Sequence, residues 1–322
     1  MLNGENSNWL PVTSGVPQGS VLGPTLFVIY INTLDIYLQD YPVLLSKFAD
    51  DTKVGMPFNN ETGSLVLQNV INTLCDWSDD LSMKFNSGKC KVMHVGGRNN
   101  HFTYTMHGFA PGGTVLESVD EEKDVGVKIS NTLKPSSQCQ AAALKANQLV
   151  GQMSRSFTYR DKYNWIRLYK VYVRPNLEYA VQAWSPWNQK DIDLLEDVQK
   201  RVVRMTAGLK PGTYQDKLKE LGLPSLEERR RRGDMIQTWK ILHQHGDVCE
   251  KTWFTRLNSA STVSTRLNSS IFNLEMKRTN LDIRKNFFSI RVVKGWNQLL
   301  GAHDHRTEIS VSNTKKIKFK LL

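Results

Sequence analysis

FADDTK, residues 48–53, lies between two largely apolar runs, residues 43–45 and 54–56. This pattern predicts a strand, a tight turn and a second strand, with Asp50 and Asp51 at or beside the turn. Adjacent carboxylates repel each other, and a bound cation relieves that repulsion. Hard divalent ions such as Mg²⁺ take oxygen ligands, and phosphoryl-transfer sites place one or two carboxylates beside the substrate phosphates. The pair is therefore a candidate metal site, and an ordinary hairpin turn that uses Asp for local hydrogen bonds is the alternative.

The stretch SGVPQGSVLGP, residues 14–24, precedes this hairpin and contains three Gly and two Pro. Such a composition predicts a shaped loop whose backbone a ligand can approach closely, with a plain connector as the alternative. The apolar residues that follow predict a largely buried helix over residues 26–34, which we expect to pack beneath the hairpin.

Further along the chain, the pattern changes from mixed to mainly helical. The pattern predicts a mixed module that ends near Leu133. We expect this module to contain a helix over residues 65–85, a strand over 89–95 and short β-like runs between 102 and 129. Helices are then predicted over the ranges 141–157, 163–174, 191–207, 226–242 and 286–300, and Pro175 can begin another. The fold class is therefore α+β.

Composition narrows the class of protein. The chain has 322 residues, of which 40% are apolar, with 8 Trp, and it is long enough for two or three globular domains.

Its four Cys lie far apart, so we expect reduced thiols in an intracellular protein. We expect surface positions for the paired histidines His243/His245 and His303/His305. The apolar run of residues 26–31 is too short to span a bilayer, so no membrane partner is expected.

Charge divides the chain into two halves. Residues 1–130 carry 8 Lys/Arg against 14 Asp/Glu, a net charge of −6, whereas residues 131–322 carry 34 against 17, a net charge of +17. A basic module beside a carboxylate site favours a polyanionic partner, most simply nucleic acid. Within this half, Glu227-Glu228 and the arginines 229–232 predict a solvated helix face with Glu–Arg pairs, and a nuclear signal or phosphate clamp is the alternative.

Several stretches carry a family resemblance together. The first are SGVPQGSVLGPTLF (14–27), FADDTK (48–53), and Trp77 followed by FNSGKC (85–90). The later ones are LYKVYVRPNLEYAVQAWSP (168–186), DIDLLEDVQKRVVRM (191–205), LGLPSLEERRRRGDMI (221–236) and RKNFFSIRVVKGWNQL (284–299). In this order and at these distances, they resemble the reverse transcriptases of non-LTR (LINE, jockey-like) retrotransposons from about Trp9 to Leu300.

The resemblance implies a site and its substrates. Asp50 matches the metal ligand of the polymerase hairpin and Asp51 its neighbour, for Mg²⁺ or Mn²⁺, and Lys89 matches a lysine that helps to protonate the leaving pyrophosphate. The residues implied to face nucleotide and template are Gly15, Pro17, Gln18, Gly19, Phe48 and Ala49. Val125 and Gly126 lie where such enzymes hold the primer end. An RNA template, a DNA primer and deoxynucleoside triphosphates are the implied partners, and the oligomeric state is left open.

The resemblance also implies a division of the chain. Residues 1–133 match part of a polymerase palm, an antiparallel sheet with helices, and residues 134–243 a helical, basic, thumb-like region. Residues 244–270 read as a linker or loop and residues 271–322 as a C-terminal helical segment with a basic tail, whose end departs from the family pattern. Family members carry a third carboxylate and a fingers region before the glycine-rich loop, but Glu5 is the sole acid before Ser14. We therefore expect this chain to be inert by itself.

Three hypotheses follow. The chain is a reverse transcriptase fragment, a non-catalytic protein that binds nucleic acid through its basic helical half, or an unrelated Mg²⁺-dependent phosphoryl-transfer enzyme. The ordered motifs favour the first over the third.

Overall fold

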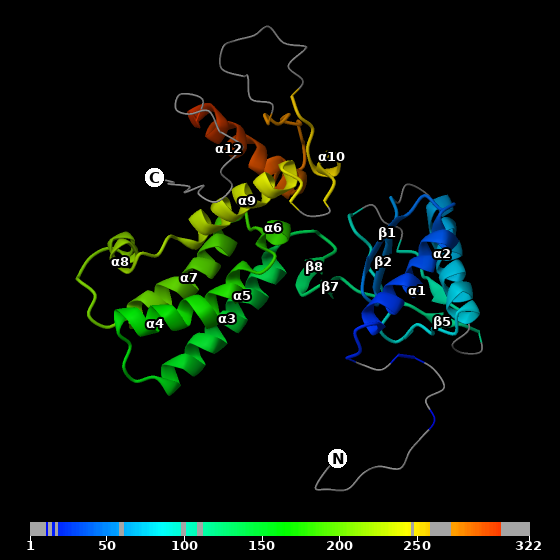
Figure 1. Ribbon diagram of the computed structural model, residues 1–322, viewed down its shortest axis with the longest axis horizontal. Coiled ribbons are helices and arrows are strands. Elements are labelled where there is room, and N and C mark those ends of the chain that lie inside the picture. Colours follow the sequence, from blue (N-terminus) through cyan, green and yellow to red (C-terminus); the bar gives the residue numbers. More distant parts are fainter. Residues whose placement is uncertain are drawn as a thin grey trace. The chain divides into compact units, whose positions relative to one another are not determined.

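The computed structural model describes residues 11, 15–16, 19–57, 61–97, 101–107, 112–245, 248–257 and 272–303 (Figure 1). Two compact units divide the chain, Met1–Val125 and Gly126–Leu322. Several sequence predictions lie outside the described residues, namely those for Glu5, Pro17, Gln18, most of the 244–270 linker and the tail after residue 303.

The predicted hairpin is confirmed. Strands β1 (Leu44–Phe48) and β2 (Asp51–Gly55) pair antiparallel, and the register sets Phe48 opposite Asp51. The turn therefore consists of two residues, Ala49 and Asp50.

Two helices cover one face of this hairpin. Helix α1 (Gly23–Leu38) begins with Pro24 in its first turn, where a missing backbone N–H costs nothing, and it packs on α2 (Glu61–Asp80). The cluster that holds them to the sheet consists of Ile31, Leu34, Leu38, Val70 and Trp77, with Val43, Leu45 and Val54 packed against it. The expectation that the 26–34 helix lies beneath the hairpin is thus confirmed. The expectation that this helix is largely buried is wrong, because only one of its faces packs on the cluster and Leu26, Val28 and Ile29 are exposed.

The other strands of the first unit are short. Strand β3 (Lys91–Val92) pairs parallel with β6 (Glu117–Ser118), and β4 (Thr105–Met106) pairs antiparallel with β5 (Thr114–Val115). Strand β7 (Glu121–Asp124) ends the unit. The α+β class is confirmed, but the strand predicted over 89–95 shrinks to two residues, and among the described residues the strand pairs do not join into one antiparallel sheet.

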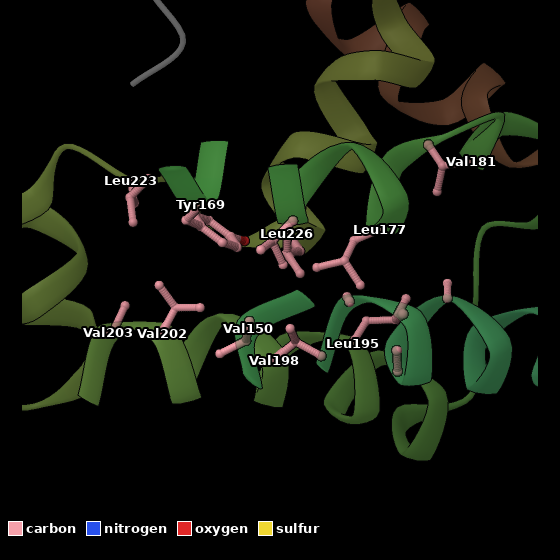
Figure 2. Close-up of a cluster of buried hydrophobic side chains, with 14 of the residues drawn as sticks. Val150, Tyr169, Leu177, Val181, Leu195, Val198, Val202, Val203, Leu223 and Leu226 are labelled. Atoms are coloured by element: carbon pink, nitrogen blue, oxygen red, sulfur yellow. The ribbon is translucent and has the colours of Figure 1, made fainter. Parts of the chain in front are cut away.

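The second unit is mainly helical, as predicted. Its elements up to residue 242 are β8 (Val127–Ser130), α3 (Ser136–Ser156), α4 (Lys162–Leu168), η1 (Tyr169–Val173), α5 (Arg174–Glu178), α6 (Val181–Trp184), α7 (Gln189–Met205), α8 (Tyr214–Leu221) and α9 (Leu226–Leu242). Figure 2 shows the cluster of buried side chains where α3, α5, α7 and the start of α9 converge. These contacts make residues 126–242 one packed body.

Helices α4, η1 and α5 form one continuous run with a wide turn in the middle. Trp165, Tyr169, Val173 and Leu177 are all buried and recur every four residues. An α-helix has 3.6 residues per turn, so such a row drifts around its surface. The π-helical turn η1 offsets this drift and keeps the row facing the core.

A buried hydrogen-bond network fixes α7. Gln199 accepts from the Tyr169 hydroxyl at 2.7 Å and donates to Glu196 Oε1 at 3.2 Å. Glu196 also accepts from the Tyr214 hydroxyl at 2.6 Å and from the Leu226 backbone N–H at 2.9 Å. Burial and the neighbouring carboxylate raise the pKa of Tyr214 well above its ordinary value. The network therefore joins α7 to η1, α8 and α9 with its polar atoms paired.

The C-terminal elements pack on the second half of α9. They are α10 (Glu250–Trp253), α11 (Asp282–Lys285) and α12 (Phe288–His303). Arg291 of α12 donates to both oxygens of Asp234 at 2.9 Å. A double hydrogen bond of this kind aligns the two helices as well as neutralising charge. A second apolar cluster, which includes Ile241 of α9 and Val292 of α12, also packs these two helices together.

The prediction for the arginine run is wrong in part. Arg231 and Arg232 are exposed, but Arg230 is buried and Arg229 pairs with Glu178 of α5. Glu228 pairs with no arginine in the described part of the chain; it caps α9, where it accepts from the Ser225 N–H at 3.0 Å. The run lies on a packed helix, so only half of it faces solvent.

His243 and His245 are exposed, as predicted, and both rings stack on Trp239. None of the four Cys forms a disulfide. Among the described helices, none is both long and apolar enough to cross a bilayer.

Candidate functional site

The two carboxylates lie at the tip of the hairpin. Ala49 has a φ of +52°, in the left-handed region, and this conformation reverses the chain within two residues. Asp50 therefore occupies the turn, and Asp51 is the first residue of β2. Both are exposed, and neither side chain makes a hydrogen bond or ion pair with another described residue. Two solvated carboxylates at adjacent positions are available to a cation.

Lys47 anchors the strand that leads into this turn. Its Nζ lies 2.9 Å from Asp35 Oδ1 and 3.2 Å from Asn32 Oδ1, both on α1. On β2 it faces Thr52, whose hydroxyl is buried without a hydrogen-bond partner among the described residues. The lysine thus ties the tip of the hairpin to the helix that follows the glycine-rich loop. Sequence reasoning did not single it out.

Lys53 connects the hairpin to the end of β7. Its ammonium group pairs with the carboxylate of Asp124. Asp124 directly precedes Val125 and Gly126, the residues implied to hold a primer end. Within the first unit, this pair therefore holds the carboxylate hairpin to the residue that precedes that segment.

The Val125-Gly126 turn has an unusual backbone. Val125 has a φ of +43° and Gly126 a φ of +84°. A positive φ is rare for a β-branched residue and stores strain of about 1–3 kcal/mol, which is often found at ligand-binding positions. A Cβ added at Gly126 would lie 3.1 Å from Cε1 of Tyr179. Glycine is therefore required there for two reasons, its backbone conformation and the Tyr179 ring.

The remaining predicted residues occupy loops. Lys89 is exposed in the turn after α2, where its N–H donates to the Asn86 carbonyl at 2.9 Å. No hydrogen bond or ion pair joins it to Asp50 or Asp51 in the described part of the chain. Gly15 and Gly19 have φ values of +83° and +85°, with no described atom within 4 Å of an added Cβ. This loop is open enough for a ligand to approach its backbone.

The donor set can be tested against a metal ion. Mg²⁺ prefers oxygen ligands and is often bound through one or two carboxylates together with substrate phosphates. Asp50 and Asp51 supply such oxygens without competing partners among the described residues. No cluster of three or more His, Cys, Asp or Glu that could hold an ion occurs in the described ranges. The pair therefore fits an ion that shares its coordination with a phosphate ligand.

Comparison with known proteins adds family information. Residues 1–142 match the family described as "Reverse transcriptase (RNA-dependent DNA polymerase)". The "RNA-directed DNA polymerase from mobile element jockey" of Drosophila melanogaster is 23% identical over 216 residues, which cover 64% of this chain and 23% of that protein. The same element's polymerase from Drosophila funebris is 26% identical over 212 residues, 61% of this chain and 22% of that protein.

A third relative is the "Probable RNA-directed DNA polymerase from transposon X-element" of Drosophila melanogaster. It is 25% identical over 209 residues, which cover 61% of this chain and 22% of that protein. No solved structure matches. The chain thus spans less than a quarter of the length of these curated relatives, and the resemblance seen in the motifs is confirmed.

Proposed function

We propose that this relative of non-LTR retrotransposon reverse transcriptases supplies part of an RNA-directed DNA polymerase, in which Asp50 and Asp51 act in nucleotidyl transfer. The observation that carries this proposal is the exposed carboxylate pair at the hairpin tip, within the segment that matches the reverse transcriptase family. The substrates would be an RNA template, a DNA primer and deoxynucleoside triphosphates, in the cytoplasm or the nucleus.

The chain's own residues would act by positioning and by charge. Asp50 and Asp51 would hold Mg²⁺ or Mn²⁺, which neutralises phosphate charge when bound. Lys47 and its α1 partners keep the hairpin in a single orientation, so the carboxylates meet the substrate phosphates without rearrangement. Gly15, Pro17, Gln18, Gly19, Phe48 and Ala49 would contact nucleotide and template, and Lys89 would donate a proton to the leaving pyrophosphate.

The primer end is assigned to Val125 and Gly126. We further propose that residues 1–133 act as the palm-like part and residues 134–243 as a thumb-like part, followed by a linker over 244–270 and a C-terminal segment over 271–322. Supporting this division, residues after Gly126 form a separate helical unit.

Primer extension on poly(A) with oligo(dT) and Mg²⁺ or Mn²⁺ tests the catalytic assignment. The comparison is the full chain, Asp50→Ala, and the matched control Asp40→Ala, which changes an exposed acid in the turn after α1. Incorporation that is lost only in Asp50→Ala supports the role of Asp50 and contradicts the expectation that the chain is inert by itself. Equal incorporation by all three proteins overturns the role of Asp50.

The second candidate function is non-catalytic binding of nucleic acid. The charge of +17 on residues 131–322 favours it, because Lys/Arg contacts to phosphates release counterions and give salt-dependent binding. Binding by the unmodified chain that weakens steeply as salt rises would support this function, whereas incorporation that depends on Asp50 would favour the polymerase.

A further inference from the structure

The junction between α3 and α4 carries exposed aromatic rings among basic side chains. We call residues 155–167 the α3–α4 corner. Tyr159 is 77% exposed and Tyr163 71% exposed, and Phe157 is exposed beside them. The corner also contains Arg155, Arg160, Lys162 and Arg167 against one acid, Asp161.

These rings are held on a fixed backbone. Asp161 caps α4 and accepts from the Tyr163 and Asn164 N–H groups at 2.9 Å each. Arg160 donates to the Ser154 carbonyl at 2.9 Å, and its guanidinium lies 5.5 Å from the Trp165 ring centroid. The exposed tyrosines therefore flank a loop that is tied to both helices. Neither tyrosine hydroxyl has a hydrogen-bond partner among the described residues.

The loop is also tied to the end of α7. The Ala207 N–H donates to the Arg160 carbonyl at 2.8 Å, and the side chain of Lys162 pairs with Glu220 of α8. Glu220 also accepts from the Lys210 N–H at 3.1 Å. Both nearby acids are thus already engaged, Asp161 by backbone N–H groups and Glu220 by lysines, so the corner presents a positive surface.

The arrangement of side chains identifies a class of ligand. Arg167 lies one turn after Tyr163 on an exposed helix face, so the two are neighbours on that face. Aromatic rings that are interleaved with cations bind single-stranded nucleic acid, because bases stack on the rings while phosphates meet the cations. A duplex hides its bases from such rings. A protein partner would also use Tyr and Arg, but the strongly basic second half favours a polyanion.

We propose that the α3–α4 corner binds unpaired nucleic acid, with bases stacked on Tyr159 and Tyr163 and phosphates near Arg155 and Arg167. This inference rests on the proposed function for its biological setting, since a template contains unpaired nucleotides. Its test does not depend on nucleotide incorporation. A failure of the catalytic assignment therefore leaves this proposal standing.

Fluorescence anisotropy with the full chain provides the measurement. The probes are a labelled 12-nucleotide RNA, the DNA of the same sequence, and the blunt duplex. The double variant Tyr159→Ser/Tyr163→Ser removes both rings, and Tyr159→Phe/Tyr163→Phe keeps them without the hydroxyls. Tyr172→Ser is the matched control, because Tyr172 is 58% exposed in the same unit but lies outside the corner. Circular dichroism and thermal unfolding establish that each variant is folded.

We expect the double Ser variant to bind both single strands about tenfold more weakly per lost ring, with little change on the duplex. The double Phe variant and Tyr172→Ser should bind like the unmodified chain. The slope of the logarithm of the single-strand binding constant against the logarithm of the salt concentration should be unchanged in the tyrosine variants. In Arg155→Gln and in Arg167→Gln, this slope should be shallower by about 0.7. Unchanged single-strand binding by a folded double Ser variant overturns the proposal, as does an equal loss on the duplex. If the double Phe variant loses as much single-strand affinity as the double Ser variant, the proposal is also overturned, because the tyrosine hydroxyls rather than the rings would then make the contact.

Discussion

Lys53 on β2 pairs with Asp124 at the end of β7, although 71 residues separate them in the chain. The pair joins the strand after the carboxylate turn to the residue before the strained Val125. Its contribution to stability is small, because both side chains are partly solvated. The pair therefore acts mainly by positioning the hairpin relative to the end of β7.

A double-mutant cycle measures this pair. We expect Lys53→Ala, Asp124→Ala and the double variant to give a coupling free energy of about 1 kcal/mol or less, which falls further as salt is added. Urea denaturation of the four proteins provides the measurement. A coupling several times larger would contradict a solvated pair.

Ala49→Gly should stabilise the hairpin. Ala49 has a φ of +52°, a conformation that costs an L-residue about 1 kcal/mol more than glycine, and part of this gain is lost to the greater freedom of glycine in the unfolded chain. We expect a net gain of about 0.5 kcal/mol in unfolding free energy. The same substitution at Ala141, inside α3, should destabilise by about 1 kcal/mol. Losses at both positions would show that Ala49 is not strained.

Gly126→Ala should destabilise more than Gly222→Ala. Both glycines have a positive φ, but an added Cβ at Gly126 would lie 3.1 Å from the Tyr179 ring, whereas Gly222 has no described atom within 4 Å. The backbone cost of about 1 kcal/mol is shared, and crowding adds about 1 kcal/mol at Gly126 alone. Thermal unfolding compares the two variants. Equal losses would mean that the Tyr179 ring moves aside freely.

Arg230→Met should stabilise the second unit. Both terminal nitrogens of Arg230 are buried without a hydrogen-bond partner among the described residues, and burial lowers the pKa of its guanidinium. Nearby Glu196 and Asp234 already have other hydrogen-bond partners, so neither acid loses its sole hydrogen bond when Arg230 is replaced. We expect a gain of about 1 kcal/mol in unfolding free energy.

Arg231→Met is the matched control, because Arg231 is the exposed neighbour and its replacement should change stability by less than about 0.5 kcal/mol. A loss of stability in Arg230→Met would show that the buried guanidinium is paired in solution.

Asp161 makes the α4 terminus sensitive to acid. Hydrogen bonds from the Asn164 N–H and its neighbours lower the pKa of Asp161 below its ordinary value. Because the folded-state pKa is depressed, the ionised carboxylate stabilises the protein at pH values above its unfolded-state pKa of about 3.9. This stability is lost as the pH falls through the folded-state pKa. Asn caps helices as well as Asp does but does not titrate there.

We therefore expect Asp161→Asn to unfold with a shallower loss of stability below about pH 4, and to match the parent chain near pH 7. Denaturation at a series of pH values checks this. Identical acid profiles would show that the carboxylate does not act through its charge.

Local patterns predict much of this fold. The hairpin appears where apolar residues flank FADDTK, and the helix predicted over 226–242 has the observed ends, because Ser225 and Glu228 give a local start signal. Helix α8 was missed: it has only eight residues, and its Thr213–Asp216 capping box lies in a short stretch without a long apolar stripe.

Contacts between distant residues could not be predicted. The burial of Arg230 and the pairing of Arg229 with Glu178 depend on which helices cover α9, and no spacing within the arginine run encodes that. The same contrast applies to the candidate site. The places of Asp50 and Asp51 can be predicted from the local turn pattern. The contacts of Lys47 with α1 and of Lys53 with Asp124 form only when the chain folds, so the sequence does not predict them.

The wide turn η1 gives the α4–α5 run one residue more than a regular α-helix needs. A π-helical turn is closed by i→i+5 rather than i→i+4 hydrogen bonds, so deleting one residue within Tyr169–Val173 can convert η1 to an ordinary α-helical turn while the helix after it keeps its orientation. Leu177, which is buried, would then stay in the core. Between related sequences, single-residue deletions along this run should therefore concentrate within η1.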